Sequence, residues 1–85
     1  MGGNRFLKIC RKIVANYYKE NGQEVTDDNI FIVWSCKTLQ NNKALLSTTM
    51  SDGRYFELTY NGDKMEIYVD VYKKSANFVV RDWED

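Results

Sequence analysis

The sequence predicts an α+β domain in which an N-terminal helix covers one face of a four-stranded antiparallel meander. Three observations predict it: a helical period in the first twenty residues, a period of two from Ile30 onward, and three turn signals between the expected strands. The 85 residues are expected to form a single domain, because chains divide into separate cores only at several times this length. We expect the helix at residues 4–20, the sheet at 29–74, and a fifth edge strand or a tail at 77–85.

The helix is predicted from one apolar stripe with helical spacing, made of Phe6, Ile9, Cys10, Ile13, Val14 and Tyr17. Asn4 is a suitable N-cap, and Asn21-Gly22 supplies the left-handed conformation that commonly ends a helix. Leu7 and Tyr18 widen the stripe, which favours packing on a broad sheet over packing on one partner helix.

The dipeptide Asn61-Gly62 predicts a hairpin with a two-residue type I′ turn, because that turn needs positive φ at both central residues. The register that follows joins apolar to apolar and aromatic to aromatic residues across the two strands. The expected pairs are Leu58 with Met65, Phe56 with Ile67, and Tyr55 with Tyr68.

Two further turns divide the first part of the sheet. Ser51-Asp52-Gly53 fits a three-residue loop with a left-handed Gly53, and that loop pairs Leu46 with Leu58, Thr48 with Phe56, and Ala44 with Tyr60. The turn around residues 40–42 leaves two registers open: a three-residue loop places Ile32, Trp34 and Cys36 on the core face, and a four-residue loop turns them outward. We prefer the core placement, because tryptophan has the largest apolar area to bury.

The cysteine content and hydropathy indicate a cytoplasmic protein. Cys10 and Cys36 are expected to be free thiols that point into the core, and buried cysteines are usually inert. The longest apolar run, "IFIVW", is five residues long, so no membrane span is expected, and the N-terminus lacks the apolar region of a secretion signal.

The side chains from which most catalytic and metal sites are built are missing. The chain has no histidine, which removes serine–histidine and cysteine–histidine pairs and most metal sites. Glu57 and Glu66 oppose each other in the Asn-Gly register, but we interpret them as surface residues screened by Lys64 and Arg54. We therefore expect no catalytic, metal or cofactor site and no enzyme activity.

Positive charge is concentrated in the helix although the net charge of the chain is zero. Residues 1–19 hold five cations and no acid, whereas residues 20–85 hold seven cations and twelve acids. The basic helix face is a candidate contact for an anionic partner such as nucleic acid, and it comprises Arg5, Lys8, Arg11, Lys12 and Lys19. Nucleic acid is nevertheless the less favoured partner, because the chain as a whole carries no net positive charge.

The outer face of the sheet, turned away from the helix, is the main candidate for protein binding. By the registers above it carries Phe31, Val33, Leu45, Tyr55, Tyr68 and Tyr72. Tyrosine interleaved with small polar residues is typical of protein interfaces, since tyrosine gives a large contact area at low entropic cost. A host protein or a second copy of the chain is the kind of partner that such a face fits.

The segment "VWSCKTLQNNKALLSTT…DG.YFELTYNGDK…YVDVYKK", residues 33–74, resembles a family of short uncharacterised proteins from phages and prophages of Gram-positive bacteria. The resemblance rests on the tryptophan, the two turns and the Tyr-Asn-Gly-Asp hairpin occurring together. It implies a phage accessory protein acting in the bacterial host cytoplasm, and it assigns no functional residues. Small phage proteins of this kind often inhibit a host defence component, such as a CRISPR–Cas effector complex, by binding it. We therefore expect a non-enzymatic inhibitor, with a nucleic-acid-binding accessory protein as the alternative.

Overall fold

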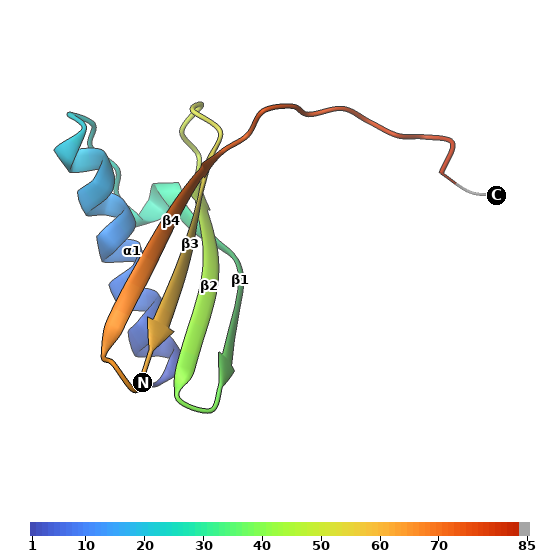
Figure 1. Ribbon diagram of the computed structural model, residues 1–85. Coiled ribbons are helices and arrows are strands. Elements are labelled where there is room, and N and C mark those ends of the chain that lie inside the picture. The colour runs from blue at the N-terminus through green and yellow to red at the C-terminus, as the bar shows by residue number, and fades with distance from the viewer. Residues whose placement is uncertain (84–85) are drawn as a thin grey trace.

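The computed structural model describes residues 1–83 and has one helix packed on a four-stranded antiparallel sheet (Figure 1). Helix α1 spans Gly3–Glu20, and a short 3-10 turn at Asp27–Asn29 leads into the sheet. The strands are β1 (Ile30–Thr38), β2 (Asn41–Thr48), β3 (Arg54–Asn61) and β4 (Glu66–Lys73), in the spatial order β1-β2-β3-β4. The expected α+β meander is confirmed.

Helix α1 begins one residue earlier than predicted and ends as predicted. Gly2, not Asn4, is the N-cap residue, and no side chain caps the first turn. At the other end Gly22 has a φ of 79°, and the amide of Gln23 donates to the carbonyl of Tyr18 (2.9 Å). This hydrogen bond satisfies a carbonyl group of the last turn, as is common in helices that end at a glycine.

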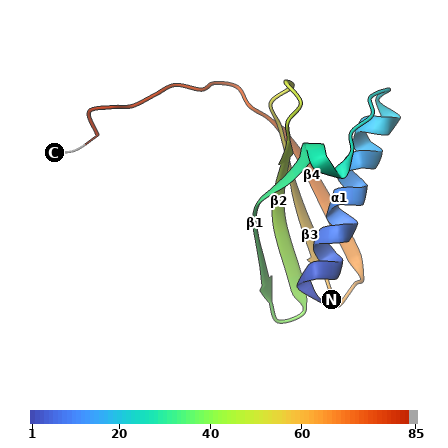
Figure 2. The same ribbon diagram turned by 180° about the vertical axis from the view of Figure 1, so that it is seen from behind.

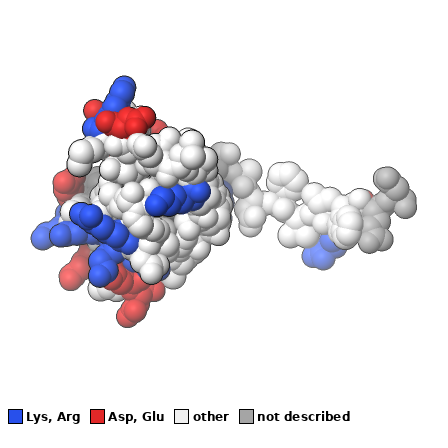
Figure 3. Space-filling view, turned by 90° about the horizontal axis from the view of Figure 1, so that it is seen from below, with Lys and Arg blue, Asp and Glu red and all other residues white. Residues whose placement is uncertain are grey.

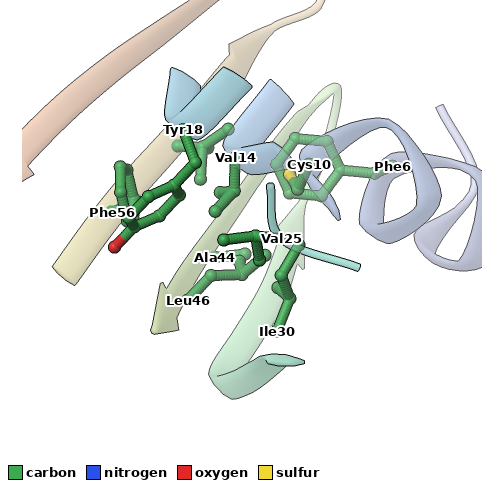
Figure 4. Close-up of a cluster of buried hydrophobic side chains, with 10 residues drawn as sticks. Phe6, Cys10, Val14, Tyr18, Val25, Ile30, Ala44, Leu46 and Phe56 are labelled. Atoms are coloured by element: carbon green, nitrogen blue, oxygen red, sulfur yellow. The ribbon is translucent and has the colours of Figure 1, made fainter. Parts of the chain in front are cut away.

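The core lies between the helix and one face of the sheet (Figure 4). The helix contributes Phe6, Cys10, Val14 and Tyr18, which recur every four residues and are all buried. They pack against Val25, Ile30, Ala44, Leu46, Phe56 and Leu58. The Tyr18 hydroxyl reaches through this layer and donates to Asp52 Oδ2 (2.8 Å), which ties the end of α1 to the β2–β3 loop.

Strands β2, β3 and β4 keep their predicted faces, although their predicted partners are wrong. Leu46 pairs with Phe56 and not with Leu58, because residues 49–53 form the β2–β3 loop. Gly53 is left-handed, with a φ of 66°, as expected. Between β3 and β4 the expected partners are displaced by four residues, so that Phe56 pairs with Val71. Both displacements are even numbers, and side chains alternate with a period of two, so every residue stays on its predicted side.

Asn61-Gly62 does not form the predicted two-residue turn. The β3–β4 loop covers residues 62–65, and Met65, with a φ of 53°, takes the left-handed position. Gly62 is required for another reason: a Cβ atom there would lie 2.3 Å from the carbonyl oxygen of Gln40 in the neighbouring turn. The Gly62 amide also donates to Asn41 Oδ1 (3.1 Å), so the two hairpin ends touch.

The preferred placement of Trp34 and Cys36 on the core face is wrong. The β1–β2 loop contains only Leu39 and Gln40, and the β1 register shifts at a β-bulge between Ile32 and Trp34. Ile32 opposes the buried Leu46, but Trp34 opposes Leu45, and Cys36 opposes Lys43 on the outer face. The inserted residue reverses the face of everything that follows it in the strand.

Strand β4 and the segment after it are the least covered parts of the fold. Helix α1 lies against β1 and β2, so Val69 and Val71, on the helix side of β4, remain exposed. The amide of Lys74 donates to the carbonyl of Gly53 (2.7 Å), and the chain then leaves the body. Residues 75–83, called here the C-terminal arm, run away from the sheet beyond β1 (Figures 1 and 2). Of the two expectations for residues 77–85, the described part therefore forms the tail, and residues 84–85 lie outside it.

Candidate protein-binding surface

The outer face of the sheet carries an aromatic row across all four strands at the end where the arm departs. Phe31, Ser47, Tyr55 and Tyr72 oppose one another in successive strand pairs. Ser47 is buried beneath the neighbouring side chains and donates its hydroxyl to the carbonyl of Arg54 (2.8 Å). This bond satisfies the buried polar group at the centre of the row.

The next row across the outer face is apolar in β1 and β2 and acidic in β3 and β4. Trp34 opposes Leu45, Leu45 opposes Glu57, and Glu57 opposes Asp70. The like charges of Glu57 and Asp70 are offset by Lys43, whose ammonium lies 3.6 Å from Glu57 Oε1. The outer face is thus aromatic toward β1 and the arm, with an ion pair at its centre.

Five large side chains in this region are partly exposed, by 41% for Trp34 up to 51% for Tyr72. The other three are Phe31, Val33 and Tyr68. Leu45 and Tyr55 are half-buried between them. Exposed apolar residues are ordinary when single, but a group of them on one face of a sheet is typical of an interaction site. These seven residues are called the aromatic face below.

All six predicted sheet-face residues belong to the aromatic face, and Trp34 joins them although it was predicted on the core face. The available signal was the run "IFIVW" at residues 30–34, in which five consecutive apolar residues cannot all serve one alternating face. A bulge within that run resolves the conflict by turning Trp34 outward. The bulge itself has no reliable signature in a single sequence.

Tyr68 is tied to a neighbouring carboxylate at the polar end of this face. Its hydroxyl donates to Glu66 Oε2, two residues earlier on β4. That hydrogen bond raises the pKa of Tyr68 above its ordinary value of 10.0. Glu66 opposes Asn61, so the predicted opposition of Glu57 and Glu66, with its screening by Lys64 and Arg54, does not occur.

The two cysteines differ in accessibility. Cys10, a residue of α1, is buried in the core between the helix and the sheet, as expected, and burial raises the pKa of its thiol from 9.0 to about 12. A thiol with such a pKa carries almost no thiolate at neutral pH and is therefore a poor nucleophile. Cys36 is exposed on the outer face of β1, which corrects its expected burial.

The five basic residues of α1 do not act as one set. Arg11 Nη1 donates to the carbonyls of Ile30 (2.7 Å) and Asp27 (3.4 Å), so this side chain fastens the 3-10 turn to the helix. The other four are exposed, namely Arg5, Lys8, Lys12 and Lys19. Figure 3 shows cationic atoms in several separate groups on this side of the molecule, some of them with acidic atoms beside them. Because Arg11 is bonded to backbone carbonyls, the basic face of α1 presents four exposed cations where the sequence predicted five.

Among residues 1–83, no group of three or more His, Cys, Asp or Glu side chains could hold a metal ion. Across the same part of the chain, no helix combines the length and hydrophobicity of a membrane crossing.

Comparison with known proteins gives one result. A search of the curated proteins and a search of the solved structures found no match. A family model matches residues 7–82, which include most of α1, all four strands and most of the C-terminal arm. The matched segment is wider than the resemblance over residues 33–74, because it takes in the helix and the arm. The chain therefore belongs to the family of unknown function DUF6275.

Proposed function

We propose that this protein is a small non-enzymatic binding protein of phage type, which inhibits a host protein by docking its aromatic face onto it. The observation that carries the proposal is the group of five large side chains, 41–51% exposed, on the side of the sheet opposite the helix. A host defence component, such as a CRISPR–Cas effector complex in the bacterial cytoplasm, is the partner that we propose.

The aromatic face has the composition and rigidity of a binding surface. Tryptophan and tyrosine are enriched among the residues that dominate binding energy, and Trp34 and Tyr72 lie at opposite sides of the face. They stand on β-strands already ordered by ladder hydrogen bonds, so little backbone entropy is lost on binding. The Lys43–Glu57 ion pair supplies polar groups beside the aromatic residues.

The phage and anti-defence part of the proposal rests on the sequence resemblance at residues 33–74. A binding role also suits the chemistry of the titratable side chains. Cys10 is buried and protonated, and Glu57 is paired with Lys43. Neither arrangement provides an activated nucleophile or a general base next to a bound substrate.

The test combines capture from host lysate with phage growth on a host that carries the defence system. The aromatic-face variant is Trp34→Ser with Tyr72→Ser. The matched control is Leu39→Ser with Met65→Ser, which changes two exposed apolar residues at turn tips. We expect the aromatic-face variant to lose both the captured protein and the protection of the phage, and the control to keep both. Equal capture and equal protection by the two variants would refute the proposal.

The alternative is a nucleic-acid-binding protein that uses α1, and the four exposed cations of that helix favour it. A Lys8→Gln, Lys12→Gln variant tests it in the same assays. Binding through phosphates falls steeply as salt is raised, whereas binding through the aromatic face changes little. Loss of protection in the lysine variant alone, together with salt-sensitive binding, would support the alternative.

A further inference from the structure

The C-terminal arm exposes apolar side chains that nothing in the described part of the chain covers. Phe78 and Trp83 are 80% and 71% exposed, and Val79 and Val80 are also exposed. Four large apolar side chains within six residues of extended chain are unfavourable in water. Phenylalanine, valine and tryptophan favour strands, so such a segment is suited to pairing with the edge of another sheet.

Strand β4 offers a surface that fits such a segment. It is an edge strand, so one row of its backbone amides and carbonyls has no ladder partner in the sheet. Beside it, between the helix and the sheet, lies a groove of about 270 Å³ lined by Ile13, Asn16, Tyr17, Glu20 and Val69, called here the β4 groove. Val69 is 40% exposed at its edge.

The opposite edge of the sheet is less suitable. Strand β1 is interrupted by the bulge between Ile32 and Trp34, and its helix side is occupied by α1. Bulges are a common way in which edge strands avoid pairing with other chains. Strand β4 pairs without interruption from Arg54–Lys73 to Asn61–Glu66 and has no such protection.

We propose that the arm of one copy adds as a strand to the β4 edge of a second copy, so that two copies exchange arms in a symmetric dimer. Side chains of an added strand alternate, so Phe78 and Val80 face the β4 groove while Val79 and Trp83 lie beside the outward tyrosines of β4. Arg81 lies on the same side of the added strand as Val79 and Trp83, which is the side on which β4 carries Asp70. The apolar residues of the arm are therefore distributed over both sides of β4.

The occupant is a second copy because each chain has both the arm and the acceptor edge, so two chains satisfy each other. Reaching its own β4 would require the arm to reverse within residues 75–77, which contain no glycine, directly after Lys74 has bonded to Gly53. Reaching a second copy requires no reversal.

The area is sufficient for a stable dimer. An aromatic side chain buries about 150–250 Å², so the two rings of two arms bury about 600–1,000 Å². The matching acceptor area brings the total to about 1,200–2,000 Å², which is the size of a specific interface.

The test uses full-length variants whose oligomeric state is measured by light scattering after gel filtration. The arm variant is Phe78→Ser with Trp83→Ser, and the acceptor variant is Val69→Lys. The matched control is Leu39→Lys, which adds the same charge to an exposed apolar residue in the β1–β2 turn. We expect the wild type and the control to be dimers. The arm and acceptor variants should be monomers with unchanged circular dichroism, their dimer dissociation constants raised by about thirtyfold or more.

Mixing the two monomeric variants identifies the contact. The acceptor variant has an intact arm and the arm variant has an intact acceptor, so an equimolar mixture should form a heterodimer with one arm–acceptor pair. In a Trp34→Phe background, the emission of Trp83 should shift to shorter wavelength when the dimer forms.

Several results would overturn the proposal. The first is a monomeric wild type, including a monomer whose arm folds onto its own β4. The second is an arm variant that is still a dimer. The third is a mixture of the two variants that stays monomeric. A dimer that dissociates on Trp34→Ser would also overturn it, because the aromatic face would then be the dimer contact. The proposed host-binding function does not depend on the outcome, since its test rests on the aromatic face.

Discussion

Replacing Gly62 with alanine probes the contact between the two hairpin ends. The added Cβ would lie 2.3 Å from the Gln40 carbonyl oxygen, 2.9 Å from Gln40 Cβ and 3.1 Å from the Gln40 carbonyl carbon. Two of these three atoms belong to the backbone, so a side-chain rotation cannot relieve the clash. The turn of residues 39–40 or the loop of residues 62–65 must move.

Forcing extra atoms into such a contact costs about 1–3 kcal/mol. For a domain of this size, about 2 kcal/mol lowers the midpoint of thermal unfolding by roughly 8–16 °C. Gly22→Ala is the matched control. Gly22 has open space around its Cβ position but a φ of 79°, so its alanine variant should lose only the cost of the left-handed conformation, about 1–2 kcal/mol.

Thermal unfolding followed by circular dichroism measures both variants. A second-site change, Gln40→Gly, removes only the contact with Gln40 Cβ, so the double variant should stay well below the wild type. If Gly62→Ala unfolds at the wild-type temperature, the two turns are not in contact and the two-residue β1–β2 loop is wrong.

Three further predictions concern single side chains. Ellman's reagent should label one thiol per native chain quickly, because Cys36 is exposed and Cys10 is buried, and the fast reaction should vanish in Cys36→Ser. The unfolding free energy should fall as pH rises from 9 toward 12. Burial raises the pKa of Cys10 from 9.0 to about 12, so the folded state favours the protonated thiol. The stabilisation from this preference is complete below the pKa of the unfolded state and is lost as the pH rises above it. Urea titrations should show a weaker fall in Cys10→Ala, and an equally steep fall would contradict this cause. Asp52→Ala should lower the unfolding free energy by about 1–3 kcal/mol in the same titration, since it leaves the buried Tyr18 hydroxyl without its carboxylate acceptor. An unchanged unfolding free energy would mean that this hydrogen bond does not stabilise the fold.

The side of the sheet on which most residues lie followed from the sequence because it depends only on alternation. Phe56, Leu58 and Leu46 are buried as predicted, although their partners differ from the expected ones by two or four positions. Even displacements preserve every face, so the hydrophobic pattern cannot reveal them. The single-residue bulge in β1 has the opposite effect, and it alone moved Trp34 and Cys36 to the other side.

Two features depended on contacts distant in sequence and could not be predicted locally. Gly62 looked like a turn residue, but its neighbour is the Gln40 backbone in another hairpin. Arg11 looked like a free cation on a basic helix face, but it bonds to the carbonyl of Ile30, 19 residues away. Local pattern identifies residue types that permit such contacts and does not identify their partners.

The order of elements along the chain has a consequence for synthesis. The helix is made first, yet its apolar stripe is covered by β1 and β2 and by Phe56 and Leu58 of β3, and about 40 residues separate Tyr18 from Leu58. At about 5–20 residues per second, the ribosome takes about 2–8 s to add that segment. An isolated helix of 18 residues is only marginally stable in water. During those seconds α1 therefore forms only transiently, and its apolar side chains are exposed. Chaperones that recognise short apolar stretches therefore compete with the sheet for Phe6, Val14 and Tyr18 until the third strand has been made.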